Sequence, residues 1–440
     1  MARRLCQSLP FSLTGAQERV WREIRTDMAE PYPMNRLLQG DVGSGKTIVA
    51  ALAVLTAIEA GYQTAFMAPT EILAEQHLLT LGGLLRPLGV EVALLTNAVK
   101  GKARTALHRG DGGGRRRLRR RHPRPRPGGR SLPAARPGRG GRAAPLRGRP
   151  ARDAAGQRES PDVLVMTATP IPRTLALTLY GDLDVSVLDE LPPGRKPVVT
   201  VARGEAKRGP IYEFLRQQVA AGRQVYVVCP LVEESEAIDL RAATEIAEGL
   251  QRSVFPELRV GLLHGRMSAA DKERVMREFK EGGIQILVST TVIEVGIDVP
   301  NASVMLIEHA ERFGLSQLHQ LRGRVGRGPW KSYCILLTAA RSEDARKRIG
   351  AMTETNDGFR IAEVDLSVRG PGDFFGTRQS GLPEFRVADL LRDAAVLEEA
   401  RADAVAIVQR DPRLLEPEHR ALRAALLTRW RGKLDLAGVG

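Results

Sequence analysis

One segment of the chain has the residues and spacing that bind nucleotide phosphates. Gly40-Asp-Val-Gly-Ser-Gly-Lys-Thr47 follows an expected strand at 35–39 and precedes an apolar stretch at 48–60 that is expected to form a helix. In such a loop, backbone N–H groups surround the phosphates, the lysine reaches the β- and γ-phosphates and the last threonine meets Mg²⁺. We therefore expect ATP and Mg²⁺ to bind here, with Thr47 as the metal ligand. The expected contacts are Gly40, Gly43, Ser44, Gly45, Lys46 and Thr47.

A second segment carries arginines suited to the other side of a nucleotide. Residues 317–327 read Gln-Leu-His-Gln-Leu-Arg-Gly-Arg-Val-Gly-Arg and place Arg324 and Arg327 three apart among glycines. Planar guanidinium groups in this setting can meet a γ-phosphate through charge-assisted hydrogen bonds. Together with the phosphate loop, this segment predicts a motor ATPase that is built from two lobes.

Hydroxyl side chains follow two further expected strands. Thr167 and Thr169 come after an apolar run at 163–166, and Thr290 and Thr291 come after another at 284–289. The carboxyl ends of parallel strands are where α/β sheets bind ligands, and a following helix N-terminus can hold a DNA phosphate. Threonine is also an ordinary capping residue, so both interpretations stay open. Gln17 is either a surface residue or an amide that reads the adenine edge.

Composition narrows the class of protein. The chain has 440 residues, of which 43% are hydrophobic, and no apolar run approaches the length of a membrane span. Its cysteines (Cys6, Cys229 and Cys334) are scattered singly, as expected of free thiols in a reducing cytoplasm. His319 has no metal-ligand partner at a suitable spacing and is expected to form hydrogen bonds. We therefore predict a cytoplasmic protein without a membrane segment.

The order of expected strands and helices predicts an α/β fold. Strand and helix alternate over 9–100 and again over 196–340, which favours two α/β lobes with parallel sheets, the first of them incomplete. The chain from 341 onward is expected to be helical. The predicted domains are 9–190, 191–340 and 341–440.

One tract interrupts this pattern and carries the excess charge. Residues 101–160 contain 18 Arg and one Lys but only three acidic residues, whereas the whole chain has a net charge of +15. The tract lacks Val, Ile, Phe, Tyr, Trp and Met, so we expect 104–158 to be disordered. The rest of the chain is nearly neutral, and a pI of about 10.2 is therefore weak support for DNA binding.

The motifs, taken in order, resemble those of superfamily-two helicases. Residues 361–383, and above all Pro371-Gly-Asp-Phe-Phe-Gly-Thr-Arg-Gln379, resemble the translocation motif of the RecG family of ATP-dependent DNA helicases. The transcription-repair coupling factor has a related motif. This resemblance covers 9–100 and 159–435, and it implies two RecA-like lobes followed by a helical region with a translocation hairpin.

The resemblance implies roles for individual residues. Lys46 and Thr47 would bind ATP and Mg²⁺, Arg324 and Arg327 would act on the γ-phosphate, and Gln320 would sense it. Arg369 and Gln379 would lie in the hairpin that moves duplex DNA. The nucleotide contacts would include Gln17 and Asp298, and the residues that bind DNA or couple to it would include Pro69, Thr70, Thr167, Thr169, Thr290 and Thr291. The implied partners are DNA forks, Holliday-type junctions and duplex DNA, and the implied state is a monomer active in recombination and repair.

Two departures from that family are expected to matter. RecG proteins begin with a wedge domain that splits the fork, yet only about eight residues precede Leu9. Their Asp-Glu-x-His motif should also lie shortly before Thr167, and no acidic residue there ends an apolar run. The tract has the length of two core strands plus this motif, so a pair of frameshifts is our preferred explanation over a natural basic insertion. We expect poor ATP hydrolysis. The alternatives are a translocase that does not unwind, like the coupling factor, and a non-catalytic DNA-binding remnant.

Overall fold

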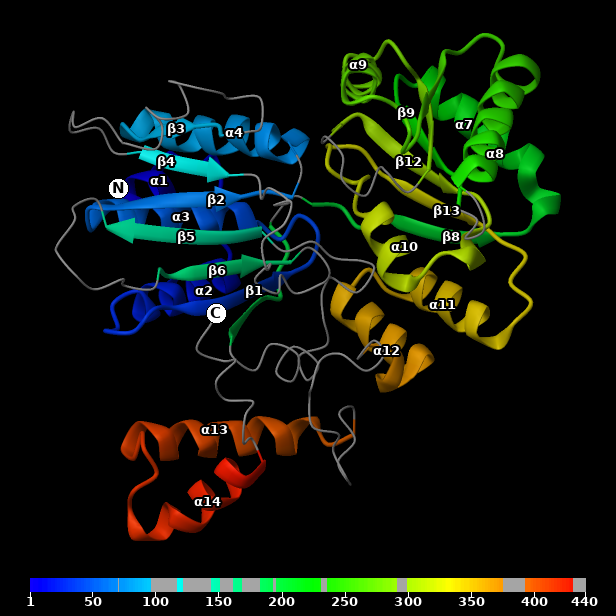
Figure 1. Cartoon of the computed structure of the whole chain (residues 1–440). Coiled ribbons are helices and arrows are strands. Elements are labelled where there is room, and N and C mark those ends of the chain that lie inside the picture. Colours follow the sequence, from blue (N-terminus) through cyan, green and yellow to red (C-terminus); the bar gives the residue numbers. More distant parts are fainter. Residues whose placement is uncertain are drawn as a thin grey trace. The chain divides into compact units, whose positions relative to one another are not determined.

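The computed structural model divides the chain into two compact units. The first comprises 1–172 and 180–377, and the second comprises 173–179 and 378–440 (Figure 1). The structure describes residues 1–69, 71–95, 117–121, 144–150, 161–167, 183–192, 195–230, 236–290, 299–374 and 392–429. Among the described helices, none combines the length and the apolar character that crossing a membrane requires.

The first unit contains two β-sheets, and the phosphate loop belongs to the first of them. This sheet has seven strands in the order β3-β4-β2-β5-β6-β1-β7. Strand β1 pairs in parallel with β6 on one side and β7 on the other, so the loop leaves from within the sheet. The strands are β1 (Asn35–Gly40), β2 (Tyr62–Met67), β3 (Glu91–Ala93), β4 (Arg117–Arg121), β5 (Ala144–Pro150), β6 (Val163–Met166) and β7 (Asp184–Leu188).

The helices of this sheet form where the sequence gives them caps and an apolar face. Helix α2 (Gly15–Asp27) starts at Thr14, whose hydroxyl accepts from the Gln17 backbone N–H while the Gln17 side chain accepts from the Thr14 N–H. Helix α3 (Lys46–Glu59) is buried over most of its length, which explains why its sequence is apolar on nearly every side. The others are α1 (Ala2–Ser8), α4 (Glu71–Leu85) and the 3₁₀ turn η1 (Arg86–Leu88).

The prediction that 104–158 is disordered is wrong for 117–121 and 144–150. Strand β4 pairs in parallel with β2 and β3, and β5 pairs with β2 and β6. Sheet ladders use backbone N–H and C=O groups, which every residue except proline supplies in full, so this composition can still fill open places in a sheet. The remaining residues of the tract lie outside the described part of the chain.

Strand β5 runs against the direction of its neighbours. It is antiparallel to both β2 and β6, and its last residue, Pro150, pairs with Tyr62 at the start of β2. The carboxyl end of β5 therefore lies at the edge of the sheet opposite the phosphate loop. Two of its residues, Pro145 and Pro150, lack the N–H that a ladder position uses.

The second sheet confirms the strand pattern expected over 196–340. Its order is β10-β11-β9-β12-β13-β8, and every pair is parallel. The α/β fold with two mostly parallel sheets is thus as predicted. The strands are β8 (Val199–Arg203), β9 (Gln224–Val228), β10 (Val260–Leu263), β11 (Ile286–Ser289), β12 (Ala302–Ile307) and β13 (Tyr333–Leu337).

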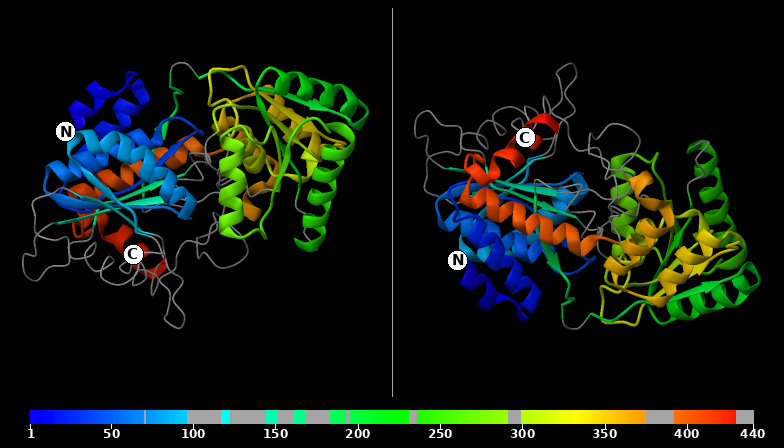
Figure 2. Two further views of the ribbon diagram at one scale, coloured as in Figure 1. Left: turned by 90° about the horizontal axis from the view of Figure 1, so that it is seen from above. Right: turned by 90° about the horizontal axis from the view of Figure 1, so that it is seen from below.

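Helices cover both faces of this second sheet (Figure 2). Neighbouring residues of one strand point to opposite faces, so Tyr226 belongs to one buried cluster and Val227 to another. The elements around the sheet are η2 (Glu205–Lys207), α7 (Arg208–Ala220), α8 (Glu236–Gly249), η3 (Leu250–Val254), α9 (Ala269–Lys280), η5 (Ala310–Arg312), α10 (Leu315–Arg322), α11 (Glu343–Glu354) and α12 (Gly358–Phe374).

The described part of the second unit is helical. It consists of α13 (Ala394–Arg410), the 3₁₀ turn η6 (Pro417–His419) and α14 (Arg420–Arg429). Of the predicted translocation motif, the structure describes the helical backbone up to Phe374, within α12. The later residues of that motif, including Gln379, lie outside the described residues.

Candidate nucleotide site

The phosphate loop takes a conformation that only its glycines allow. Gly43 and Gly45 have φ angles of 80° and 88°, in the left-handed region that side chains disfavour. A Cβ at Gly40 would lie 2.9 Å from the Cβ of Leu188 on β7, so the strand end also needs glycine. Gly45 is the N-cap of α3, which places the helix N-terminus and its N–H groups at the loop.

Lys46 is folded onto this loop. Its ammonium group donates to the carbonyl oxygens of Gly40 and Asp41, each at 2.7 Å. Burial lowers the pKa of Lys46 to about 8, and although Asp41 opposes that shift, Arg195 and Arg327 add to it. The side chain expected to reach phosphates is therefore held at the loop among other cations.

Two arginines lie within electrostatic reach of Lys46. Arg195 comes from the segment between β7 and β8 and donates to the carbonyl oxygen of Val42. Arg327 follows α10, and its Nε donates to the Gly323 carbonyl at 3.1 Å. Burial, followed by the charge of Arg195, lowers the pKa of Arg327 to about 10. Positive groups from three parts of the chain thus surround one loop, which is an arrangement suited to a polyphosphate.

Helix α10 contacts the same loop directly. His319 Nε2 lies 2.6 Å from Asp41 Oδ1, and His319 Nδ1 lies 3.1 Å from an Arg322 guanidinium nitrogen. Just after the helix, Gly323 packs against Val42, where a Cβ would come within 2.8 Å of the valine Cβ. The expectation that His319 forms hydrogen bonds is confirmed.

The buried Gln17 amide braces the loop. Its Nε2 donates to the Ser44 carbonyl at 2.8 Å, and its Oε1 accepts from the Thr14 N–H at 3.1 Å. Its side chain also fills the space that a Cβ on Gly45 would need. In this arrangement both ends of the amide have protein partners, and adenine recognition by Gln17 stays a prediction.

The structure describes some of the other residues that were predicted to bind nucleotide or DNA, and it leaves the rest undescribed. Thr167 and Thr290 are buried at strand ends, and their N–H groups donate to Leu38 and Leu263 of neighbouring strands. Pro69 follows β2, Gln320 lies on α10, and Arg324 acts electrostatically on the same phenol, Tyr226, as Arg327 does. Arg369 belongs to α12, and the structure describes its backbone only. Thr70, Thr169, Thr291, Asp298 and Gln379 lie outside the described residues. DNA contacts by these side chains stay predictions.

Reasoning from the sequence missed Arg195. It lies in the segment Pro192-Pro-Gly-Arg-Lys-Pro197, which joins the two sheets. A stretch rich in proline and glycine that also carries two adjacent cations is an unusual linker, and this was the signal available in the sequence. Asp41 was also missed, because its role depends on a histidine that is far away in the chain.

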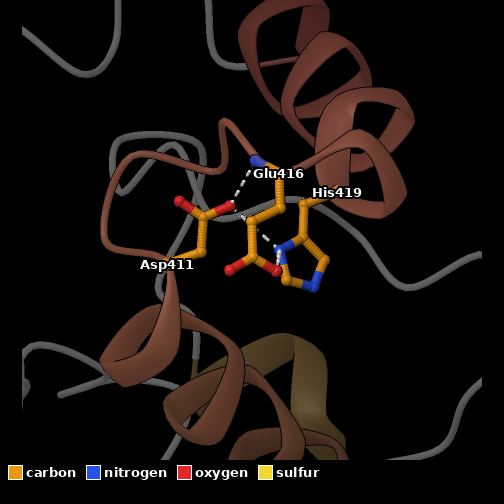
Figure 3. A group of neighbouring side chains, drawn as sticks. All are labelled: Asp411, Glu416 and His419. Carbon is orange, nitrogen blue, oxygen red and sulfur yellow. Dashed lines mark hydrogen bonds and ion pairs between the residues drawn. The ribbon is translucent and has the colours of Figure 1, made fainter.

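A cluster of possible metal ligands lies in the second unit (Figure 3). Asp411, Glu416 and His419 gather where α13 turns toward α14. Asp411 Oδ2 accepts from the Glu416 N–H at 2.9 Å and lies 3.0 Å from His419 Nδ1, while Arg410 lies 3.2 Å from His419 Nε2. Burial would raise the pKa of Asp411, but backbone donors and His419 lower it to about 2. Asp411 and His419 already have protein partners, and the positive charge of Arg410 disfavours a cation beside them. We therefore interpret this cluster as hydrogen bonds that hold the turn between α13 and α14.

The fold and the loop define the chain as a protein with superfamily-two helicase domains. The DEAD/DEAH box helicase model matches residues 14–111, and the helicase conserved C-terminal domain matches 206–329. The match to the first ends inside the arginine-rich tract. A structural likeness at 12% identity, to a DUF1998 helicase bound to DNA and AMPPNP, has a TM-score of 0.52 over 90% of this chain and 59% of that one, and shows the fold alone.

Within this class, the chain is a homologue of the RecG helicases. The model for domain 3, C-terminal, of the ATP-dependent DNA helicase RecG matches residues 355–439. The chain is 50% identical to RecG of Bacillus subtilis over 96% of this chain and 62% of that protein. It is 49% identical to RecG of Synechocystis over 96% and 50%.

A solved structure supports the same assignment. RecG bound to a three-way DNA junction is similar with a TM-score of 0.69 and 44% identity, over 90% of this chain and 52% of that one. The chain spans roughly half to three-fifths of the length of the relatives that it matches.

Proposed function

We propose that this chain is the motor part of an ATP-dependent DNA translocase of the RecG type, which remodels forks and junctions in recombination and repair. One observation carries the proposal: the phosphate loop and α10 meet through Asp41 and His319 at 2.6 Å, with Lys46 and Arg327 beside them. A nucleotide held by both elements favours the state in which they are together, and hydrolysis releases them.

The residues present fit the phosphates of ATP. Gly43 and Gly45 open the loop, Lys46 supplies a cation at the start of α3, and Arg327 supplies another from beyond α10. Burying these positive groups together is unfavourable unless an anion accompanies them. A bound triphosphate would relieve this repulsion and take the place of the loop carbonyls as the partner of Lys46.

The fit to Mg²⁺ and to water activation is weaker. Thr47 offers a hydroxyl, and the carboxylate of the loop, Asp41, already accepts from the Val42 N–H at 2.6 Å and contacts His319. Mg²⁺ sites usually use one or two carboxylates in addition to phosphates. Because β5 ends at the far edge of the sheet, it does not bring an acidic residue to the loop. We therefore propose ATP binding with hydrolysis reduced by about 10²- to 10⁴-fold, the usual contribution of a general base.

DNA is the proposed partner. The structure of RecG bound to a three-way junction supports this proposal because it shares 44% identity with the chain. We propose that the chain acts as a monomer in the cytoplasm and that the segment around Arg369 couples nucleotide state to movement along duplex DNA.

The test begins with nucleotide binding and then adds DNA. Binding of fluorescent ATP and ADP is titrated for the natural chain and for Lys46→Ala, and ATPase activity is measured with and without forked DNA. Binding that Lys46→Ala abolishes supports the motor assignment. Hydrolysis without unwinding would favour a translocase like the coupling factor. DNA binding without nucleotide binding would leave the non-catalytic remnant as the answer.

A further inference from the structure

We propose that Arg195 is a phosphate-binding residue of the nucleotide site. In this way the linker between the two sheets would contact the bound polyphosphate directly. This inference deepens the proposed function and rests on it. It concerns a residue between the helicase motifs, in the chain that connects β7 to β8.

The linker that carries Arg195 is attached to the second sheet's arginine segment. The neighbouring Lys196 donates to the Pro329 carbonyl at 2.9 Å, and a Cβ at Gly326 would lie 2.9 Å from the side chain of Val198. The linker is therefore fixed to the segment that carries Arg327. From this attachment, the Arg195 side chain reaches back to the phosphate loop of the first sheet.

The guanidinium group of Arg195 is seated on the phosphate loop itself. It donates to the Val42 carbonyl and lies over Gly43, where any Cβ would overlap it. Gly43 is part of the loop whose N–H groups are expected to cradle phosphates. A guanidinium has five donors in a planar fork that matches phosphate oxygens. Among the described residues, its hydrogen-bond acceptor is this one carbonyl, so donors remain for a ligand.

The charges around Arg195 also favour an anionic ligand. Arg195, Lys46 and Arg327 form a cationic group in which Arg195 lowers the pKa of each of the other two, and Asp41 is the opposing charge that acts on Lys46 and Arg195. A purely structural arginine in a partly buried place usually pairs with a carboxylate, yet this one adds positive charge to a cationic site. A nucleoside di- or triphosphate is the ligand whose charge and shape complete the arrangement.

The experiment compares phosphate chains of different length on the full chain. Binding of ADP, AMP and adenosine is measured by calorimetry for the natural protein, Arg195→Ala and Arg195→Lys. Lys207→Ala is the matched control, because it removes a positive charge from an exposed position beyond the linker. Melting curves of each free variant verify that it is folded.

A phosphate-binding role predicts a loss that grows with the phosphate chain. Arg195→Ala should weaken ADP binding by about ten- to a hundredfold, the effect of a hydrogen bond to a charged group, and leave adenosine binding unchanged. Arg195→Lys should recover part of the loss, and Lys207→Ala should stay within about twofold of the natural chain.

Three results would overturn the inference. An equal loss for ADP, AMP and adenosine would make Arg195 a structural brace. Unchanged or tighter ADP binding, with Lys46→Ala still weakening it, would remove Arg195 from the site while the proposed function stands. Failure of the natural chain to bind ADP at all would remove the nucleotide site and this inference together.

Discussion

His319 Nε2 lies 2.6 Å from Asp41 Oδ1, which joins α10 of the second sheet to the phosphate loop of the first. The hydrogen-bond partners of His319 determine which of its two ring nitrogens carries the proton. A guanidinium nitrogen of Arg322 lies 3.1 Å from His319 Nδ1 and can only donate, so Nδ1 accepts and Nε2 carries the proton. The same arginine donates to the carbonyl oxygens of Met352 and Thr355, which fixes the imidazole from behind. His319 therefore bridges a fixed arginine and a loop carboxylate.

The Asp41–His319 contact should show as a coupling energy. His319→Ala removes one of the two donors to a partly buried carboxylate, so we expect a loss of about 1–3 kcal/mol in the free energy of unfolding. In a double-mutant cycle with Asp41→Ala, chemical denaturation should give a coupling of about 0.5–3 kcal/mol. Strictly additive single variants would show that the contact contributes nothing in solution.

Acid should remove part of the same stabilisation. Burial raises the pKa of Asp41, but the hydrogen bonds from His319 and from the Val42 N–H outweigh it and lower the pKa below 3.8. A lowered carboxyl pKa adds stability above the unfolded value that is lost as the pH falls through the folded value. The natural chain should therefore lose more stability below pH 3.8 than Asp41→Ala does, as measured by chemical denaturation at a series of acid pH values.

Close packing of Gly323 on Val42 predicts a steric conflict with a specific remedy. Gly323 has φ −66° and ψ −8°, so alanine is allowed by its backbone, but the new Cβ would lie 2.8 Å from the Val42 Cβ. Gly323→Ala should cost about 1–3 kcal/mol, as overpacking does.

Trimming the opposing side chain should restore the stability that Gly323→Ala removes. We expect Gly323→Ala with Val42→Gly, which removes the opposing Cβ, to melt close to Val42→Gly alone. Gly204→Ala is the matched control, since a Cβ there meets nothing within 4 Å. Should the double variant melt as low as Gly323→Ala, the two residues do not touch in solution.

Lys46 predicts opposite effects of alkali on binding and on stability. Because burial lowers the pKa of Lys46 to about 8, the free protein loses this positive charge as the pH rises above 8, and ADP affinity should fall. The unfolded lysine titrates near 10.5, so the contribution of this group to folding stability should improve between pH 8 and 10.5. Lys46→Met should remove both dependences. Calorimetric ADP titrations from pH 7 to about pH 10 measure the first, and an ADP affinity that stays constant over that range would contradict it.

The origin of the arginine-rich tract can be tested on the nucleotide sequence alone. If compensating frameshifts produced it, the DNA under residues 109–158 read in another frame encodes two strands rich in Val and Leu, the second ending in Asp-Glu-x-His. Restoring that frame should return DNA-stimulated ATPase activity, and Lys46→Ala should abolish it again. Absence of an Asp-Glu pair after an apolar run in all three frames would make the tract a genuine feature of this protein.

The positive charge of the arginine-rich tract predicts DNA binding that weakens with salt and does not depend on the DNA sequence. Replacing Arg124, Arg126, Arg130, Arg136 and Arg139 with Gln leaves β4 and β5 untouched. For every arginine that binds a DNA phosphate, the replacement should flatten the slope of log affinity against log salt by about 0.9 on duplex DNA. An unchanged slope in fluorescence anisotropy titrations would assign the binding to another surface.

The sequence by itself determined the two α/β sheets and the chemistry of the phosphate loop. Apolar runs of strand length alternate with helical stretches, and Gly43, Gly45 and Lys46 have local backbone and charge requirements that can be recognised without a fold. The same local reasoning placed 104–158 outside the sheets, and it was wrong for β4 and β5, because pairing with β2 and β6 depends on which sheet positions are open.

Only the tertiary structure decided which distant residues complete the loop. Asp41 and His319 are 278 positions apart, and Arg195 reaches Val42 across 153. Such partners have no periodicity or spacing in the sequence, because their proximity follows from how two sheets and a linker pack. Gln17 illustrates the same limit, because only the structure shows that its buried amide donates to Ser44 and so braces the loop.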